Sequence, residues 1–232
     1  MRLARPVTAV VFDMDGVLLD TERLYTQATQ QIVGRFGKVF DWSIKGHMIG
    51  RPARDSARYL VDALELPITP DDYLREREGL FETLMPTAEA MPGARALVEA
   101  LDARGVPIAV ATSSASRLYA LKITRHRDWF ARFRAVVNGD DPRVAHGKPA
   151  PDIYLLAARE LGVEPARCVA VEDAPAGVQS ARAAGMQVIA VPDPALGRER
   201  VADADLVLES LEGLRPADLG FAGVASGEGS GA

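Results

Sequence analysis

The stretch Phe12-Asp13-Met14-Asp15-Gly16 is the most informative part of this 232-residue sequence. It follows directly on a short apolar run, residues 9–12, which is typical of a buried β-strand. Two carboxylates at positions i and i+2 lie near one point at the tip of such a strand, and their charges repel. The arrangement becomes favourable where a divalent cation binds and one carboxylate oxygen serves as a nucleophile. We therefore expect a metal-assisted catalytic site where the first strand ends.

Short apolar runs alternate with helical patterns through most of the chain. The runs predict strands at residues 7–12, 107–111, 135–138, 168–171, 187–191 and 206–208, and amphipathic patterns predict helices at residues 94–104, 152–161 and 175–184. Such alternation is typical of a parallel sheet with helices on both faces. The predicted fold class is α/β, a doubly wound, Rossmann-like parallel sheet that binds ligands at the carboxyl ends of its strands.

Residues 22–87 interrupt this alternation. They show helical patterns at 24–36, 54–65 and 70–84 and no convincing strand, with Gly37, Pro67 and Pro86 as breaks. A helical block directly after the first strand predicts an inserted α-helical cap beside the strand tips. We expect residues 1–21 and 88–218 to form the core and 22–87 the cap. Residues 219–232 are expected to be a flexible tail, because the last seven residues offer almost nothing apolar to bury.

Composition and charge argue against several classes of function. The net charge of −5 disfavours general binding to nucleic acid or to an anionic membrane. Cys168 is the only cysteine, which excludes a disulfide framework and a cysteine-rich zinc site. No run of 18 apolar residues occurs, and the basic start is followed by too short an apolar run for a secretory signal. We expect a soluble, cytoplasmic protein of undetermined oligomeric state without nucleic-acid or membrane partners.

Residues suited to phosphoryl transfer follow four of the predicted strands, whose tips are neighbours in a doubly wound sheet. Carboxylates can attack phosphorus or act as acid and base, and Mg²⁺ prefers such hard oxygen ligands. Hydroxyl, amide and ammonium groups neutralise phosphate oxygens. The four segments are Asp13 with Asp15, Thr112-Ser113-Ser114, Gly147-Lys148-Pro149 and Glu172-Asp173. Together they predict a small pocket for phosphate chemistry.

In this order the four segments resemble the four motifs of the haloacid dehalogenase (HAD) superfamily, and the helical insertion resembles its subclass with a small α-helical cap. The resemblance extends from residue 7 to about residue 215. A closer resemblance, to the group that contains pseudouridine-5′-phosphatases and glycerol-3-phosphatases, extends over residues 20–25, 112–114, 139–142, 146–149 and 172–177 and over Lys122, Arg125 and His126. The resemblance implies a Mg²⁺-dependent phosphatase with an aspartyl-phosphate intermediate. Its expected partner is a small phosphomonoester, such as a sugar, polyol or nucleoside monophosphate.

The resemblance also implies a role for each catalytic and phosphate-binding residue. Asp13 would be the nucleophile, and Asp15 the general acid and base. Thr112 and the backbone amide of Ser113 would hold the phosphate group. Lys148 would bridge the phosphate and the Asp13 carboxylate.

Four residues would hold the Mg²⁺ ion if the resemblance extends to the metal site. Asp13 and Asp173 would ligate it through their carboxylates, and Asp15 through its backbone carbonyl. Glu172 would be either a direct or an outer-shell ligand. This acidic set argues against the metal-free dehalogenase branch of the superfamily.

Two other functions remain open from the sequence. A β-phosphoglucomutase-like isomerase would share the core chemistry but needs a cap that binds a second phosphate. Arg51 is the clearest candidate for binding it, and Tyr25 stands where the mutase pattern has a histidine. A catalytically silent binding module is the other alternative, and the completeness of the four motifs argues against it.

The remaining cap and histidine side chains are expected to have modest roles. Lys45 could reach the leaving group but fits a solvated surface as well, and the aromatic side chains of the cap fit its core by default. The three histidines have no zinc-ligand spacing, and surface or supporting positions are expected for them. The side chains concerned are Tyr25, Phe40, Trp42, His47, His126 and His146.

Overall fold

The core of the molecule is a six-stranded parallel sheet in the order β5-β4-β1-β6-β7-β8. The structure is a computed structural model that describes residues 3–48 and 53–221. The strands are β1 (Ala9–Phe12), β4 (Ile108–Thr112), β5 (Ala135–Asn138), β6 (Cys168–Glu172), β7 (Gln187–Ala190) and β8 (Leu206–Val207). The predicted α/β class and doubly wound sheet are therefore confirmed.

Alternate residues of β1 enter two separate apolar clusters, one on each face of the sheet. Val10 and Phe12 pack with α5 (Ala94–Asp102) and α7 (Arg127–Phe130), and α6 (Ser116–Lys122) lies against the same cluster. Ala9 and Val11 pack with α8 (Asp152–Leu161) and α9 (Pro175–Ala183) on the other face. Because both faces are covered, the strands are continuous apolar runs rather than alternating ones.

The strand register brings the predicted site segments to one edge. Phe12 of β1 pairs with Val110 of β4 and with Val171 of β6. The chain direction is the same in all of these strands, so the residues that follow each of them leave the sheet side by side. The first strand lies between β4 and β6, where the strand order reverses, and ligands of doubly wound folds bind at this point.

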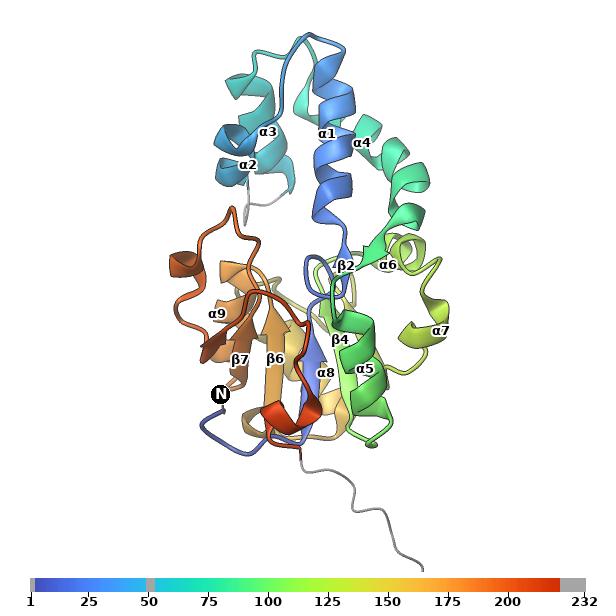
Figure 1. The fold of residues 1–232 in the computed structure, drawn as a ribbon. Helices are drawn as coiled ribbons and strands as arrows, with labels where there is room; N and C mark the ends of the chain where they lie inside the picture. Colours follow the sequence, from blue (N-terminus) through green and yellow to red (C-terminus); the bar gives the residue numbers. More distant parts are fainter. Residues whose placement is uncertain (1–2, 49–52, 222–232) are drawn as a thin grey trace, which may run out of the picture.

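Four helices form a separate layer beyond this edge (Figure 1): α1 (Glu22–Gly34), α2 (Trp42–Met48), α3 (Ala53–Ala63) and α4 (Pro70–Leu84). They share an apolar cluster of their own, which includes Ile32, Leu60 and Tyr73. The helix α4 begins in a capping box between Thr69 and Asp72. Both connections to the core run through a short antiparallel ladder of β2 (Leu19–Asp20) and β3 (Glu89–Ala90).

Several elements were not predicted from the sequence, and the predicted tail begins too early. The helices α2, α6 and α7 and the β2–β3 ladder are too short to give a clear periodic pattern. Leu219 and Phe221 are buried in the main core cluster, because the turn η4 (Pro216–Leu219) packs against α5. Residues 222–232, the rest of the predicted tail, lie outside the described residues. None of the described helices is long and apolar enough to cross a membrane.

Candidate active site

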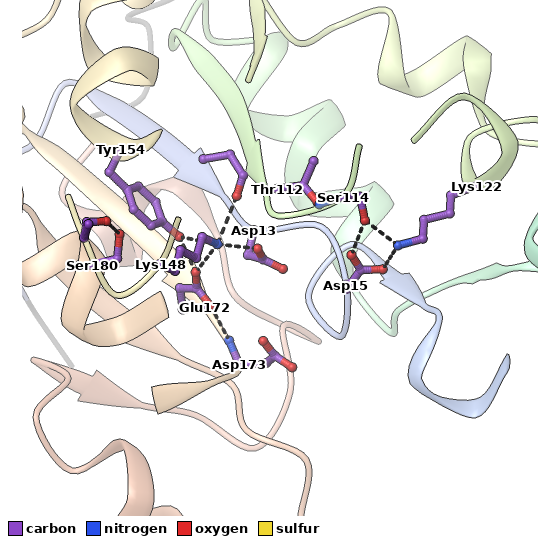
Figure 2. A network of polar contacts seen from close by, with 12 residues as sticks. Asp13, Asp15, Thr112, Ser114, Lys122, Lys148, Tyr154, Glu172, Asp173 and Ser180 are labelled. Carbon is purple, nitrogen blue, oxygen red and sulfur yellow. Dashed lines mark hydrogen bonds and ion pairs between the residues drawn. The ribbon is translucent and has the colours of Figure 1, made fainter. Parts of the chain in front are cut away.

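Three carboxylates meet where β1 and β6 end (Figure 2). Ligand oxygens of Asp13, Glu172 and Asp173 all lie within 4.8 Å of one another. Asp13 and Glu172 are buried and Asp173 is half-buried. The backbone amide of Asp13 donates to the carbonyl of Val171 at 2.9 Å, so the sheet itself fixes the first carboxylate beside the other two.

One lysine, Lys148, forms ion pairs with two of these carboxylates. The Nζ atom of Lys148 lies 2.5 Å from Oδ1 of Asp13 and 2.6 Å from Oε1 of Glu172, and it also donates to the carbonyl of Ala111 at 3.1 Å. The hydroxyl of Tyr154 donates to the same oxygen of Glu172 at 2.5 Å. We call Asp13, Lys148, Glu172 and Asp173 the Asp13 cluster.

The Asp13 cluster contains more acidic groups than its single lysine can neutralise. Burial raises the pKa of Asp13 to about 7, although the Lys148 ammonium opposes the shift and the charges of Glu172 and Asp15 add to it. Burial, followed by the charges of Asp13 and Glu172, raises the pKa of Asp173 well above its ordinary value. A divalent cation would remove this repulsion, and a set of carboxylate oxygens is what Mg²⁺ prefers. The donor set therefore fits the expected metal.

Two glycines leave the space that the carboxylates occupy. Gly16 has a φ of +77°, and a Cβ atom there would lie 2.3 Å from Oδ2 of Asp173. Gly177, in α9, faces Glu172, and a Cβ atom there would lie 2.0 Å from the carboxylate. Any larger residue at either position would displace a member of the Asp13 cluster.

The side chain of Asp15 lies in a different environment, although only one residue separates it from Asp13. It accepts hydrogen bonds from Lys122 and Thr21, and from the hydroxyl of Ser114 at 3.0 Å. Lys122 is fully buried and also donates to the hydroxyls of Tyr25 (2.9 Å) and Ser114 (2.7 Å). We call these five residues the Asp15 cluster.

Charges in the Asp15 cluster are balanced. Burial raises the pKa of Asp15, but the Lys122 ammonium and the hydrogen bonds from Lys122, Thr21 and Ser114 outweigh burial, so the pKa is lowered overall. Burial lowers the pKa of Lys122, and the nearby Asp15 carboxylate more than reverses that shift. One half-buried anion therefore faces one fully buried cation.

The structure thus places the predicted site residues in two neighbouring groups. Asp13, Lys148, Glu172 and Asp173 meet directly, whereas the Asp15 side chain turns toward Lys122. Metal binding through the Asp15 backbone carbonyl remains a prediction.

The predicted phosphate-binding segment follows β4. The Oγ atom of Thr112 accepts from the backbone amide of Ser114 at 3.1 Å and so holds the turn. Ser113 is exposed beside it. Phosphate binding by Thr112 and Ser113 also remains a prediction.

Sequence reasoning assigned no role to Lys122, Thr21, Ser114 or Tyr154. Lys122 and Thr21 were visible only as matches to the phosphatase group, and Ser114 was visible also as the last residue of the predicted phosphate-binding segment. One further signal was available for Lys122, because it stands between Leu121 and Ile123 in an otherwise apolar stretch. A lysine so placed needs a buried partner.

A cavity of about 560 Å³ lies between the Asp15 cluster and the helical cap. From the core it is lined by Asp15, Ser113 and Ser114, and from the cap by side chains that include Tyr25, Phe40, Lys45 and Arg77. Lys45 forms an ion pair with Glu22 at 3.1 Å and lies 4.9 Å from the ring centre of Trp42. Arg51, the other cap cation considered from the sequence, lies outside the described residues.

The three histidines contact residues outside the Asp13 and Asp15 clusters. Nε2 of His126 is 2.8 Å from the carbonyl of Ala88, and its ring contacts Trp129. His47 lies against the ring of Tyr59, and His146 is exposed near Asp152. These contacts agree with the supporting and surface positions expected for them.

Comparison with known proteins gives concordant matches. A family model described as haloacid dehalogenase-like hydrolase matches residues 7–185. The chain is 45% identical over 220 residues to (DL)-glycerol-3-phosphatase 1, mitochondrial, of Arabidopsis thaliana, covering 93% of this chain and 74% of that protein. It is 45% identical over 223 residues to a probable pseudouridine-5′-phosphatase of Drosophila melanogaster, covering 95% and 96%. A crystal structure of a HAD family hydrolase from Deinococcus radiodurans with bound phosphate and sodium is 29% identical, with a TM-score of 0.76 and coverage of 91% and 95%.

Proposed function

Since this chain belongs to the haloacid dehalogenase-like hydrolase family, we propose that it hydrolyses a small phosphomonoester with Asp13 as the nucleophile. Membership of the family and the predicted phosphatase class are confirmed by the family model and by the phosphatase relatives. The roles of individual residues are our proposal. The observation that carries it is the meeting of Asp13, Glu172 and Asp173 around one point, with Lys148 bonded to two of them.

We propose that Mg²⁺ is the cofactor, held by the carboxylates of Asp13, Asp173 and Glu172 and by the backbone carbonyl of Asp15. When bound, the ion neutralises charge on the carboxylates and on the phosphate oxygens. Lys148 supplies a fixed positive charge beside the nucleophile, and it stays protonated because Asp13 and Glu172 outweigh the effect of burial and raise its pKa. Thr112 and the amide of Ser113 bind the phosphate oxygens that face β4.

The reaction has two displacement steps. An oxygen of Asp13 attacks phosphorus, the ester P–O bond breaks, and Asp15 gives a proton to the departing alkoxide. Asp15 then takes a proton from a water molecule, whose oxygen attacks phosphorus and releases the Asp13 carboxylate with inorganic phosphate. In the arrangement described, Lys122 holds Asp15 ionised, which suits the second step. The first step requires Asp15 to gain a proton and to move from Lys122 toward the ester oxygen.

The leaving group occupies the cavity under the cap. Its volume of about 560 Å³ falls within the usual range of small-molecule sites. The relatives are named for glycerol 3-phosphate and pseudouridine 5′-phosphate. We therefore propose a phosphorylated polyol, sugar or nucleoside as the substrate class.

A phosphate-release screen tests this proposal. The purified chain is incubated with Mg²⁺ and glycerol 3-phosphate, glucose 6-phosphate, glucose 1-phosphate, pseudouridine 5′-phosphate or phenyl phosphate, with the Asp13→Asn variant as the control. Release of phosphate by the wild type alone supports the assignment. Conversion of glucose 1-phosphate to glucose 6-phosphate without free phosphate would identify a mutase instead. Absence of turnover of every ester would contradict the proposed function.

A further inference from the structure

Arg77 is a cation of the cavity for which the described residues provide no hydrogen-bond or ion-pair partner. It lies on α4 and lines the cavity together with Asp15 of the core. Its Nε atom is shielded from solvent and has no hydrogen-bond partner, and its guanidinium forms no hydrogen bond or ion pair with any residue that the structure describes. A buried donor left without an acceptor is unfavourable, so such a group in a ligand cavity indicates that the ligand supplies the acceptor.

Two aromatic rings set the position of this guanidinium. Its Cζ atom lies 5.6 Å from the ring centre of Tyr73 and 5.3 Å from that of Phe81. Both rings are buried, and the Tyr73 hydroxyl is fixed by a 2.9 Å hydrogen bond with Thr29. Stacking on rings fixes a planar guanidinium while leaving its N–H groups free to bind.

The other charged side chains that line the cavity are already paired. Glu22 pairs with Lys45 at 3.1 Å, and Asp15 pairs with Lys122. Glu78 pairs with Arg117 at 3.1 Å. Among the described lining residues, Arg77 is therefore the one charge that no protein group balances.

We propose that Arg77 recognises oxygen acceptors on the leaving group and so selects phosphate esters of oxygen-rich alcohols over apolar esters. The inference rests on the proposed function. Guanidinium N–H groups form a fixed fork that suits paired oxygens, such as two hydroxyls, a ring carbonyl with a hydroxyl, or a carboxylate. Arg77 thereby acts as a specificity residue that contacts the leaving group.

Matched substrates and variants test the inference. Glycerol 3-phosphate and n-propyl phosphate have the same carbon chain and differ in hydroxyls, and 3-phosphoglycerate adds a carboxylate to that chain. Glucose 6-phosphate and pseudouridine 5′-phosphate extend the oxygen-rich series, and phenyl phosphate extends the apolar one. The variants are Arg77→Met, Arg77→Lys and, as a control on the same helix, Arg75→Met. Arg75 is exposed and pairs with Asp72.

For the best oxygen-rich substrate, Arg77→Met should lower kcat/KM by about 10- to 100-fold, the usual value of hydrogen bonds to a charged group. The same variant should change kcat/KM for n-propyl phosphate and phenyl phosphate by less than about threefold, which also shows that it is folded. Arg77→Lys should recover part of the lost kcat/KM, because the positive charge remains while the planar arrangement of guanidinium N–H donors is lost. Arg75→Met should behave as wild type.

A change that does not distinguish oxygen-rich from apolar esters overturns the inference. A uniform loss across all esters would assign Arg77 to the fold or to the chemistry, and no loss on any ester would remove its role altogether. A loss of kcat/KM confined to 3-phosphoglycerate would identify a carboxylate as the acceptor. A loss confined to substrates whose leaving group is uncharged would identify hydroxyl or carbonyl oxygens. Either result supports the inference. A wild type that hydrolyses no ester would refute the proposed function and this inference with it. If the wild type is active and the Arg77→Met variant does not distinguish oxygen-rich from apolar esters, only the inference is refuted.

Discussion

The Asp13 cluster and the Asp15 cluster both combine carboxylates with one lysine, but in different proportions. In the first, three carboxylates share Lys148, and burial raises the pKa of Asp13 to about 7. In the second, one carboxylate faces Lys122, and its pKa is lowered despite burial. Two acids separated by one residue are thus given different properties by their neighbours rather than by local sequence.

This difference explains how one short motif can supply two functions. Excess negative charge suits the Asp13 cluster to the proposed cation and to the proposed role of Asp13 as nucleophile. Balanced charge in the Asp15 cluster keeps that side chain hydrogen-bonded to Lys122 and apart from the carboxylates of the Asp13 cluster. Charge changes in the two clusters should therefore have different consequences for stability and activity.

The largest effect is expected for Asp13→Asn. Loss of the nucleophile should lower kcat by about a thousandfold or more, since an amide cannot form the phosphoenzyme. The same change removes one of three repelling charges, so the metal-free variant should be at least as stable as wild type in thermal unfolding. Retention of more than a few per cent of wild-type activity would show that Asp13 is not the nucleophile.

Removing the lysine of each cluster should give contrasting results. Lys122→Met leaves the half-buried Asp15 without its cation and should lower the free energy of unfolding by about 2–3 kcal/mol, less than the loss of a partner from a fully buried pair. Added Mg²⁺ should not restore this loss relative to wild type, because the Asp15 side chain does not face the metal site. Lys148→Met leaves carboxylates that a cation can balance, so Mg²⁺ should restore most of its lost stability.

Denaturant unfolding of both variants with and without Mg²⁺ measures this contrast. Equal rescue of the two variants would show that the clusters are not electrostatically separate. A fully stable Lys122→Met variant would show that the buried pair with Asp15 does not form.

The next effect concerns pH and the Asp13 cluster. Unfolded Asp13 ionises near its ordinary pKa of 3.8, whereas folded Asp13 ionises near 7. Between these values the folded chain holds more protons than the unfolded chain, so the free energy of unfolding of the metal-free protein falls as pH rises through this window. The raised pKa of Asp173 acts in the same direction.

Mg²⁺ binds ionised carboxylates and should therefore stabilise the protein more at pH 8 than at pH 6, by about 1–2 kcal/mol. The measurement is the Tm with and without Mg²⁺ at both pH values, with Asp13→Asn as the control that should show a smaller difference. A Mg²⁺-induced shift in Tm that is the same at pH 6 and pH 8 would contradict the assignment.

The position of the Asp13 cluster could be predicted because every step of the inference is local or set by strand register. Apolar runs that end in Asp13, Thr112 or Glu172 mark the strand tips, and a parallel sheet aligns these tips at one edge. The family resemblance then supplied the expected role of each residue of the Asp13 cluster. The structure shows the carboxylates and Lys148 together, as expected from the sequence.

The partners of Asp15 and the orientation of Arg77 could not be predicted in the same way. Lys122 lies 107 residues from Asp15 in sequence, on a helix of seven residues whose periodicity is weak. Arg77 stands among the charged residues Arg75, Glu76 and Glu78, a pattern typical of a solvated face. Which of these side chains faces the cavity depends on how α4 packs on the other cap helices and on the core, and no local signal contains that information.

The smallest effect is expected for Arg117, which bridges α6 of the core to Glu78 and Glu82 on α4 of the cap. All three side chains are largely exposed, so the ion pairs should contribute less than about 1 kcal/mol, unlike the pairs in the two buried clusters. Arg117→Gln should change KM by at most about threefold at low salt, through weaker contact between cap and core. The difference from wild type should disappear at high salt, where the Debye length falls to about 3 Å at 1 M.

The measurement is KM against ionic strength, with Arg95→Gln, which breaks an exposed ion pair to Glu99 within the core, as the control. An effect of Arg117→Gln that persists at high salt would mean that this bridge is shielded from solvent, and the contrast between buried and exposed ion pairs would not hold for it.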